Sequence, residues 1–434
     1  MGIPVNTPTF ESAKAAGIET VAVIGLGYIG LPTAAILATN GLKVIGVDVS
    51  SATVEAVNRG EVPFVEPDLG TSVAGAVAQG FLRAQKETPA ADAFIVAVPT
   101  PFQADKSADL SYIEDAARAI APQLRGGELI ILESTSPPQT TAHMAQVVLE
   151  ARPDLSLDGS EGRPAVLFAH CPERVLPGRV MIELVTNDRI VGGLNAGAAA
   201  AATALYKVFC KGEILETDAT TAELSKLVEN AYRDVNIAFA NELSVVSKNL
   251  GVDVWELIEL ANHHPRVNIL QPGPGVGGHC IAVDPWFIVA ADPENARLIR
   301  TAREVNDSKP QRVVEQILEP LDGNGAPTIA ALGLAFKPNI DDMRESPAVD
   351  IVHKLATQRP DAKILVVTPH SKVLPKKLEG FTNITSATAE EAIAAADVVA
   401  LLVDHDKFRE IDTATLAGKH VVDTRGFWHI RDNE

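Results

Sequence analysis

Cysteine is scarce in this chain of 434 residues, which has three. Cys171, Cys210 and Cys280 are too few and too widely spaced for the disulfide scaffold of a small secreted protein. A reducing compartment is therefore the simplest setting, and a single thiol can act there as a nucleophile. The cysteine content favours a cytoplasmic protein.

Long apolar runs and targeting segments are lacking too. No stretch approaches the roughly 20 apolar residues that a membrane helix needs, and the Ala-rich segment Ala196–Tyr206 is short and ends at Lys207. The N-terminus has no basic region followed by an apolar stretch, so no signal peptide is predicted. We expect no membrane partner.

Positive charge is in deficit. Lys and Arg number 37 against 56 Asp and Glu, which gives a net charge of −19. This balance argues against a nucleic-acid partner, because phosphate backbones are bound by basic patches. If the substrate carries phosphates, a few local Lys, Arg or backbone N–H groups must bind them.

The length suits two or three domains rather than one core. In the first half and again from about Pro320, short apolar runs alternate with helical patterns, which is typical of a doubly wound parallel sheet. Ser346 and Pro347 resemble an N-cap and the first residue of a helix. The expected strands are Thr20–Ile24, Lys43–Val47, Phe94–Val98, Glu128–Leu132, Val166–Ala169, Ile329–Leu334, Lys363–Val367, Val398–Val403 and His420–Asp423.

Between the two alternating regions, Ala219–Leu250 has apolar residues at three- and four-residue steps without interruption. Such a long helix predicts a spine between domains. The expected fold class is therefore α/β, with two Rossmann-like doubly wound domains joined by a long central helical spine. We expect domain boundaries at 1–212, 213–319 and 320–434.

A glycine-rich turn follows the first expected strand and opens a helix. Its spacing, G-L-G-Y-I-G, allows a tight turn and the close approach of a pyrophosphate to the helix N-terminus. Asp48 ends the next strand, where a carboxylate can bind ribose hydroxyls, and no Arg follows to bind a 2′-phosphate. A bare strand–turn–helix is the alternative, but the combination favours NAD. The cofactor contacts expected here are Gly25, Gly27, Tyr28, Ile29, Gly30 and Asp48.

Two further loops follow buried strands of the same domain, Val98–Pro101 and Glu133–Ser136. Ligands bind at the carboxyl edge of such sheets, which makes Pro99, Thr100 and Thr135 candidate cofactor contacts. Taken singly, either loop is equally typical of an ordinary turn.

The segment Gly275–Asp284 places a thiol and a carboxylate four residues apart in a glycine-rich loop. A lone cysteine is usually a small buried hydrophobe, but these surroundings favour an exposed, reactive Cys280. His279 could be a base or a zinc ligand. No second Cys or His completes a metal-ligand spacing, so no metal is predicted.

Lys226 and Asn230 lie four residues apart on one face of the expected spine. Their neighbours do not distinguish an active-site pair from a solvated one.

Together these segments resemble the UDP-glucose/GDP-mannose dehydrogenase family, from about Thr20 to Arg425. The longest matching motifs are Val65–Leu69, Cys171–Gly178, Asn262–Ile288 and Gly333–Ser346. The resemblance implies an NAD-binding first domain, a central dimerisation domain, a last domain that binds a UDP-sugar, and a homodimer. Within the family it is similar to the branch that oxidises UDP-N-acetyl-D-mannosamine. His279 and Val283 stand where the glucose branch has Ser and Lys, which argues against plain UDP-glucose.

The resemblance also implies roles for single residues. Cys280 is expected to be the nucleophile and Asp284 to position water and protons. Lys226 and Asn230 are expected to stabilise oxyanions, with Glu173 and Thr135 assisting hydrolysis. Arg266 is expected to reach the substrate of a neighbouring subunit. The remaining expected contacts are Arg344 to cofactor or substrate phosphate, and Arg174, Val175, Gly277, His279, Phe336 and Lys337 to the substrate.

The implied chemistry is a four-electron oxidation of C6 through a thiohemiacetal and a thioester on Cys280. The alternatives are UDP-N-acetyl-D-glucosamine or UDP-glucose as substrate, a two-electron β-hydroxyacid dehydrogenase, and a non-catalytic NAD-binding sensor. Two NADH per substrate distinguish the first reading from the two-electron enzyme.

Overall fold

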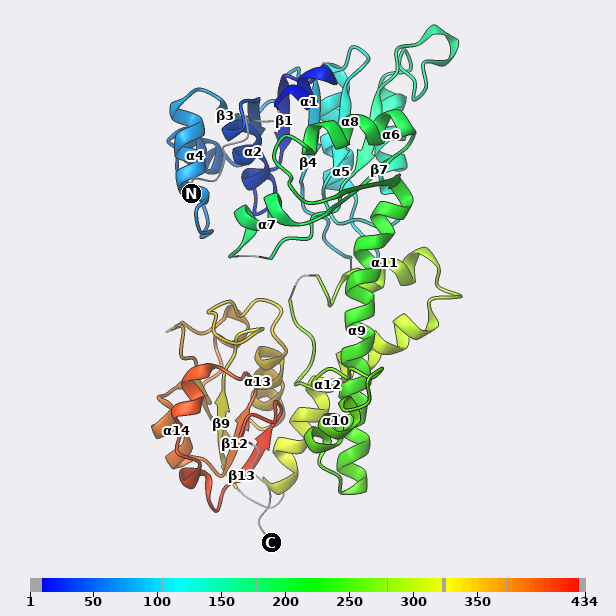
Figure 1. Ribbon diagram of the computed structural model, residues 1–434. Helices are drawn as coiled ribbons and strands as arrows, with labels where there is room; N and C mark the ends of the chain where they lie inside the picture. The colour runs from blue at the N-terminus through cyan, green and yellow to red at the C-terminus, as the bar shows by residue number, and fades with distance from the viewer. Residues whose placement is uncertain are drawn as a thin grey trace, which may run out of the picture. The chain divides into compact units, whose positions relative to one another are not determined.

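The computed structural model describes two compact units, Met1–Val228 and Glu229–Glu434, whose boundary falls inside helix α9 (Ala219–Leu250) (Figure 1). The predicted α/β class, with two Rossmann-like sheets and a long central helix, is confirmed. Within the described part, no helix is long and apolar enough to cross a membrane. The described residues are 10–103, 105–176, 178–278, 280–321, 325–371 and 373–428.

The first unit contains an eight-stranded sheet in the order β3-β2-β1-β4-β5-β6-β7-β8. The strands are β1 (Thr20–Ile24), β2 (Lys43–Val47), β3 (Leu82–Gln85), β4 (Ala93–Val96), β5 (Leu129–Leu132), β6 (Leu167–His170), β7 (Arg189–Gly193) and β8 (Ile214–Asp218). The helices are α1 (Phe10–Ala15), α2 (Gly30–Thr39), α3 (Ser51–Asn58), α4 (Leu69–Ala78), α5 (Ser111–Ile120), α6 (Thr140–Ala151), α7 (Val180–Thr186) and α8 (Ala196–Tyr206).

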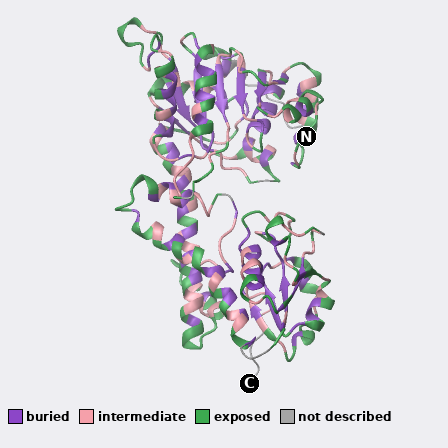
Figure 2. Cartoon of the chain, turned by 180° about the vertical axis from the view of Figure 1, so that it is seen from behind, coloured by how far each residue is buried: buried purple, intermediate pink, exposed green. Residues whose placement is uncertain are grey.

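Helices cover both faces of this sheet, which is why its central strands are apolar throughout. Alternate residues of β1 belong to different hydrophobic clusters: Val21 and Val23 pack with α2 and α4, whereas Ala22 and Ile24 pack with α5 and α6. Figure 2 shows these strands buried between partly exposed helices. The site residues at the strand ends are therefore carried by a rigid layer.

The second unit contains a five-stranded parallel sheet in the order β11-β10-β9-β12-β13. Its strands are β9 (Thr328–Leu332), β10 (Lys363–Val367), β11 (Ile384–Ser386), β12 (Val398–Leu401) and β13 (His420–Asp423). The helices are α10 (Val254–Asn262), α11 (Asp284–Ala291), α12 (Arg297–Leu318), α13 (Pro347–Gln358) and α14 (Ala389–Ala395). As predicted, Ser346 caps α13, accepting a hydrogen bond from the Ala348 N–H.

The strand predictions for β1, β2, β10 and β13 are confirmed residue for residue. Sequence reasoning missed β3, β7, β8 and β11, which are short or carry polar residues, as in the exposed sequence of β8. The sheet is also not parallel throughout, because β7 runs antiparallel to β6. The direction in which a strand runs does not change its pattern of apolar residues, so the sequence did not indicate this reversal.

Candidate active site

The glycine turn after β1 has the geometry of a dinucleotide-binding loop. Gly25 has φ +93°, and a Cβ there would lie 2.5 Å from the Ala97 carbonyl oxygen. A Cβ on Gly30 would lie 1.9 Å from the Gly25 oxygen, so α2 can begin close to the strand only with glycine. At Gly27, by contrast, a Cβ would meet nothing within 4 Å, which leaves the backbone open to a ligand. These features fit a pyrophosphate at the N-terminus of α2.

Asp48 is held beside this turn. Its Oδ2 accepts a hydrogen bond from the Leu26 N–H (3.0 Å), and its Oδ1 accepts one from the Ser50 N–H (2.8 Å). Each oxygen retains a further lone pair, so the oriented carboxylate can still accept hydrogen bonds from ribose hydroxyls. Tyr28 is partly exposed and its ring lies 4.3 Å from that of Phe64.

The two strand-end loops of the first unit are joined. Ser134 Oγ, after β5, donates to the Val98 carbonyl oxygen after β4 (2.6 Å). The buried hydroxyl oxygens of Thr100 and Ser136 have no hydrogen-bond partner among the described residues. Buried hydroxyls normally find partners, so these two fit contacts to a ligand. Sequence reasoning had named Pro99, Thr100 and Thr135 but missed Ser136.

Glu133, beneath these loops, was also missed. Its carboxylate is buried and accepts hydrogen bonds from Tyr206 Oη (2.6 Å) and Thr33 Oγ1 (3.3 Å). Burial, and then repulsion by Glu173, raises the pKa of Glu133 to about 7. A carboxylate and two Ser/Thr residues directly after an apolar strand could have indicated a buried charge, but the partners of Glu133 lie too far away in sequence to be inferred.

Glu173 forms a buried ion pair with Arg189, with 3.3 Å between Oε2 and Nη2. Its Oε1 accepts hydrogen bonds from the backbone N–H groups of Arg174 and Val175, so the whole carboxylate is oriented. Arg189 stacks over the Tyr206 ring at 4.7 Å. The predicted residues Glu173, Arg174 and Val175 therefore form one local structure, which Arg189 completes.

The environments of the three cysteines differ. Cys171 is buried beside Arg189, and burial raises the pKa of its thiol to about 12, so it remains protonated. Cys210 is partly buried, and its thiol contacts the Asn187 carbonyl oxygen at 3.5 Å. Cys280 is exposed. Exposure makes Cys280 the cysteine best suited to attack a substrate.

Asp284 and Asn230, two of the predicted site residues, meet beside the Cys280 loop. Asp284 is the first residue of α11, and its N–H donates to the Cys280 carbonyl oxygen (2.9 Å). Asn230 Nδ2, from α9, donates to Asp284 Oδ2 at 2.5 Å. Lys226 lies four residues before Asn230 on the same helix and is partly exposed. His279 lies outside the described residues.

The glycines before Cys280 pack against the segment that leads into α13. A Cβ on Gly277 would lie 2.6 Å from the Glu345 carbonyl oxygen, and the Gly278 N–H donates to that oxygen (3.3 Å). Gly277 therefore has a packing role besides the predicted ligand contact. Arg344, next to this contact, pairs with Asp342, with 2.6 Å between Nη2 and Oδ2.

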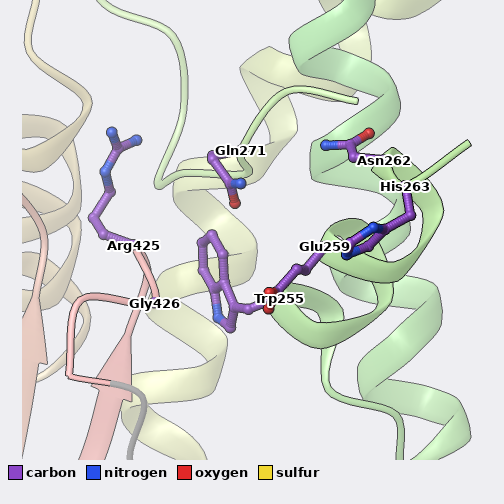
Figure 3. A pocket seen from close by; sticks show the side chains of 7 residues that line it. All are labelled: Trp255, Glu259, Asn262, His263, Gln271, Arg425 and Gly426. Atoms are coloured by element: carbon purple, nitrogen blue, oxygen red, sulfur yellow. The ribbon is translucent and has the colours of Figure 1, made fainter. Parts of the chain in front are cut away.

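Lys337 and Phe336 follow β9 in the second unit. The Lys337 ammonium lies 5.7 Å from the centroid of the Phe336 ring, and both residues line a cavity of about 100 Å³. A larger cavity, of about 470 Å³, also belongs to this unit (Figure 3). The side chains that line it come from α10, the loop after it and the turn after β13. The lining residues are Trp255, Glu259, Asn262, His263, Gln271, Arg425 and Gly426.

Sequence reasoning did not assign this larger cavity. Arg425 brings a cation whose Nε contacts Asp404 Oδ1 (2.9 Å), and Trp255 brings an aromatic ring, so the cavity can hold a planar, polar ligand. Arg266 is exposed. In the described part of the chain, no group of three or more His, Cys, Asp or Glu is arranged to hold a metal ion.

Comparison with family models matches almost the whole chain. Residues 19–210 match the NAD binding domain of the UDP-glucose/GDP-mannose dehydrogenase family. Residues 220–308 match the central domain of that family, and residues 330–430 match its UDP binding domain.

Known proteins resemble the chain over similar lengths. An NDP-N-acetyl-D-galactosaminuronic acid dehydrogenase from Ralstonia nicotianae is 56% identical over 414 residues, or 95% of this chain and 97% of the relative. A UDP-N-acetyl-D-mannosamine dehydrogenase from Escherichia coli K12 is 54% identical over 418 residues, 94% and 99% of the two chains. The solved structure of a UDP-D-ManNAc dehydrogenase from Pyrococcus horikoshii is 37% identical, with a TM-score of 0.81 over 95% of this chain and 96% of that one.

Proposed function

Because the chain belongs to the UDP-glucose/GDP-mannose dehydrogenase family, we propose that it oxidises UDP-N-acetyl-D-mannosamine at C6, from alcohol to carboxylate. It is an NAD-dependent nucleotide-sugar dehydrogenase. The observation that carries the mechanism is the exposed Cys280 beside an Asp284 carboxylate that Asn230 orients.

Cys280 makes a second oxidation at the same carbon possible. Bound NAD⁺ supplies the hydride acceptor for each oxidation. After the alcohol has become an aldehyde, Cys280 Sγ adds to the carbonyl carbon and forms a thiohemiacetal. Oxidation of that adduct leaves a thioester, and water hydrolyses it to the carboxylate and the free thiol. The covalent bond also prevents the aldehyde from leaving between the two oxidations.

Asp284 and Asn230 serve proton transfer and orientation in this scheme. Asn230 fixes the Asp284 carboxylate, which can then accept a proton from the attacking water. Lys226, one turn earlier on α9, supplies a cation for the oxyanions of the tetrahedral adducts. The oriented Glu173 carboxylate and the Thr135 hydroxyl order water for hydrolysis.

The open turn at Gly27 and the oriented Asp48 support cofactor binding in the first unit. In the second unit, Lys337 and Arg344 supply cations for the diphosphate. The 470 Å³ cavity suits the nucleoside, because Trp255 can stack on a base and Arg425 lies in the matched UDP binding domain.

A second candidate substrate is the corresponding galactosamine derivative. The Ralstonia relative is named for N-acetyl-D-galactosaminuronic acid, and it is as similar to this chain as the mannosamine enzymes are. Both names describe nucleotide-linked 2-acetamido sugars, so the two candidates share the chemistry at C6 and differ in sugar configuration.

NADH formation with UDP-ManNAc, UDP-GalNAc, UDP-GlcNAc, UDP-glucose and GDP-mannose tests this choice. We expect the highest kcat/KM with UDP-ManNAc and two NADH per sugar. A tenfold preference for another sugar, about 1.4 kcal/mol in transition-state binding, would reassign the substrate. One NADH per sugar would favour the two-electron enzyme. Cofactor binding without turnover would favour a sensor.

The thiol mechanism has its own test. Cys280→Ala is expected to abolish acid formation, because the second oxidation requires the thiol. The variant should retain its NAD⁺ affinity, because neither cofactor binding nor the first oxidation uses the thiol. Cys210→Ala, the matched control in a partly buried site, is expected to keep full activity. Acid production by the Cys280→Ala variant at the wild-type rate would rule out covalent catalysis.

A homodimer in the cytoplasm completes the proposal, with domains at 1–212, 213–319 and 320–434. On α9, Tyr232, Phe239 and Val246 recur every seven residues and are exposed, Tyr232 by 72%. Residues seven apart share a helix face, so this apolar stripe suits an isologous contact with a second copy.

In such a dimer, Arg266 would serve the partner's site. Co-expressed Cys280→Ala and Arg266→Ala chains should recover activity in mixed dimers, and verified heterodimers without activity would exclude the shared site.

A further inference from the structure

Four polar side chains are buried where helices α9 and α12 of the second unit meet. They are Asp234 and Asn241 from α9, and Arg303 and Asn306 from α12, each at most 1% exposed. Two of them carry full charges. A buried charged pair of this kind requires an explanation, because desolvation opposes it.

These side chains form one continuous hydrogen-bonded network. Arg303 Nη1 donates to Asp234 Oδ1 in an ion pair. Asn306 Nδ2 donates to the same oxygen (2.8 Å), and also to the Asp234 carbonyl oxygen (3.0 Å). Asn241 Nδ2 donates to Asn306 Oδ1 (2.8 Å). On its other side, Arg303 Nη2 donates to Asp307 Oδ1 (2.8 Å), at the solvent edge of the network.

The network bonds to the backbone on both sides of the Cys280 loop. Asn241 Oδ1 accepts a hydrogen bond from the Gly273 N–H at 2.9 Å. Arg303 Nη1 donates to the carbonyl oxygen of Ile281, the residue after Cys280, at 3.4 Å. The segment between these two points contains Gly275, Gly277 and Gly278, whose backbone is intrinsically free. Its two ends are thereby tied to the same buried structure.

Stability alone does not account for the ion pair. Apolar residues of similar volume often replace a buried pair without loss of stability, whereas removing one partner leaves an unpaired buried charge. What such residues cannot supply is directional hydrogen bonding to Gly273 and Ile281. The charges therefore fit a role in fixing a backbone geometry.

We propose that Asp234, Asn241, Arg303 and Asn306 are positioning residues that hold both ends of the Cys280 loop, and so aim its thiol at the substrate carbon. This inference rests on the proposed role of Cys280 as the nucleophile. In this scheme the four residues act through the backbone at Gly273 and Ile281.

The test removes the network without leaving a buried charge. Asp234→Leu/Arg303→Met replaces both charges together, and Asn241→Leu removes the Gly273 contact in a neutral variant. Lys309→Met is the matched control, because Lys309 on α12 is also buried and polar, and its ammonium bonds the Ser244 hydroxyl of α9. Each variant should unfold cooperatively within about 4 °C of the wild-type Tm; if the double variant does not fold, Asn241→Leu decides.

Two measurements separate positioning from general packing. The first is the alkylation rate of Cys280 by iodoacetamide across a range of pH, followed by peptide mass spectrometry, with Cys171 and Cys210 as internal references. The second is the division between kcat and KM for the nucleotide sugar. We expect the network variants to change the alkylation rate by about fivefold or more. We also expect them to lower kcat by about tenfold with unchanged KM. Lys309→Met should do neither.

If the network variants fold but change the alkylation rate by less than about fivefold and kcat by less than about tenfold, the inference is wrong. Alkylation does not require turnover, so the two proposals can fail separately. A changed alkylation rate in the variants, in a protein that oxidises no nucleotide sugar, would retain the network's role and reject the proposed function.

Discussion

The two sheets share a strand order and differ in the loop that follows the first strand. β3-β2-β1-β4-β5 in the first unit and β11-β10-β9-β12-β13 in the second are the same arrangement. After β1 the chain enters α2 through residues 25–29, whereas after β9 it crosses residues 333–346 before α13 begins. One architecture thus presents two different carboxyl edges, and the loops decide what each binds.

The short loop places a helix N-terminus at the carboxyl edge of the first sheet. Gly27 is open on the outside, and the backbone of α2 starts at Gly30. In the second unit, the glycine after β9 has no open space beside its backbone, because a Cβ on Gly333 would lie 2.6 Å from the Val403 side chain. Its long loop instead carries the side chains of Phe336, Lys337 and Arg344. A backbone cradle suits a dinucleotide, and side-chain cations suit a nucleotide sugar.

The edges differ as well in the charges beneath them. At the first edge, Glu133 is buried against Tyr206, and Glu173 is buried with Arg189. At the second edge, Asp404 and Arg425 form a pair that is partly exposed. At the first edge, desolvation raises the pKa of the Glu133 carboxyl.

The largest effect expected from this contrast is on the pH dependence of the free energy of unfolding. Burial raises the pKa of Glu133 to about 7, from 4.5 in an unfolded chain, so the folded protein holds this proton more tightly. Its stabilising contribution is complete below the unfolded pKa and is lost as the pH rises through 7. Two and a half pKa units correspond to about 3 kcal/mol.

Glu133→Gln should flatten this dependence, since the amide cannot ionise and can still form hydrogen bonds with Tyr206 and Thr33. Urea denaturation between about pH 5 and pH 8 measures it. Glu61→Gln is the control: Arg59 lowers the pKa of Glu61, which stays ionised throughout this range. An unchanged pH slope in Glu133→Gln would mean that Glu133 is not protonated in the fold.

An intermediate effect is expected at the cofactor edge. Asp48→Ala should weaken NAD⁺ binding about thirtyfold, because a charged acceptor for ribose hydroxyls is lost. Asp92 is a matched control at the opposite end of β1, where its carboxylate accepts two backbone hydrogen bonds, from Glu19 and Thr20. Asp92→Ala should alter the stability of the fold but leave the NAD⁺ affinity, measured by calorimetry, unchanged. Equal losses of affinity in the two variants would reduce Asp48 to a structural residue.

The smallest effect is expected at the exposed second edge. Lys337→Ala should raise the KM for the nucleotide sugar about tenfold and leave NAD⁺ affinity unaltered. The effect is small because solvent screens the charge of an exposed cation. Lys363→Ala, at the amino end of the same sheet, is the control and should change neither. If Lys337→Ala weakened NAD⁺ instead, the assignment of the two edges would be reversed.

Local patterns were enough to predict many of the elements that bury apolar residues. The boundaries of β1, β2 and α9, the glycine turn and the glycine-rich loop before Cys280 follow from periodicity and from glycine spacing, which report on short stretches of backbone. The same patterns missed β8, because its residues are mostly exposed and show no apolar period. They also missed β7, and its reversed direction does not alter an apolar period.

Tertiary packing alone decided which distant residues meet. Asn230 reaches Asp284 across 54 positions, Tyr206 reaches Glu133 across 73, and Arg303 reaches Asp234 across 69. No periodicity encodes such contacts, because they arise only when whole helices and strands are packed and their buried polar groups must find partners. The sequence by itself therefore determined the cofactor turn and the candidate nucleophile. The folded structure determined what orients them.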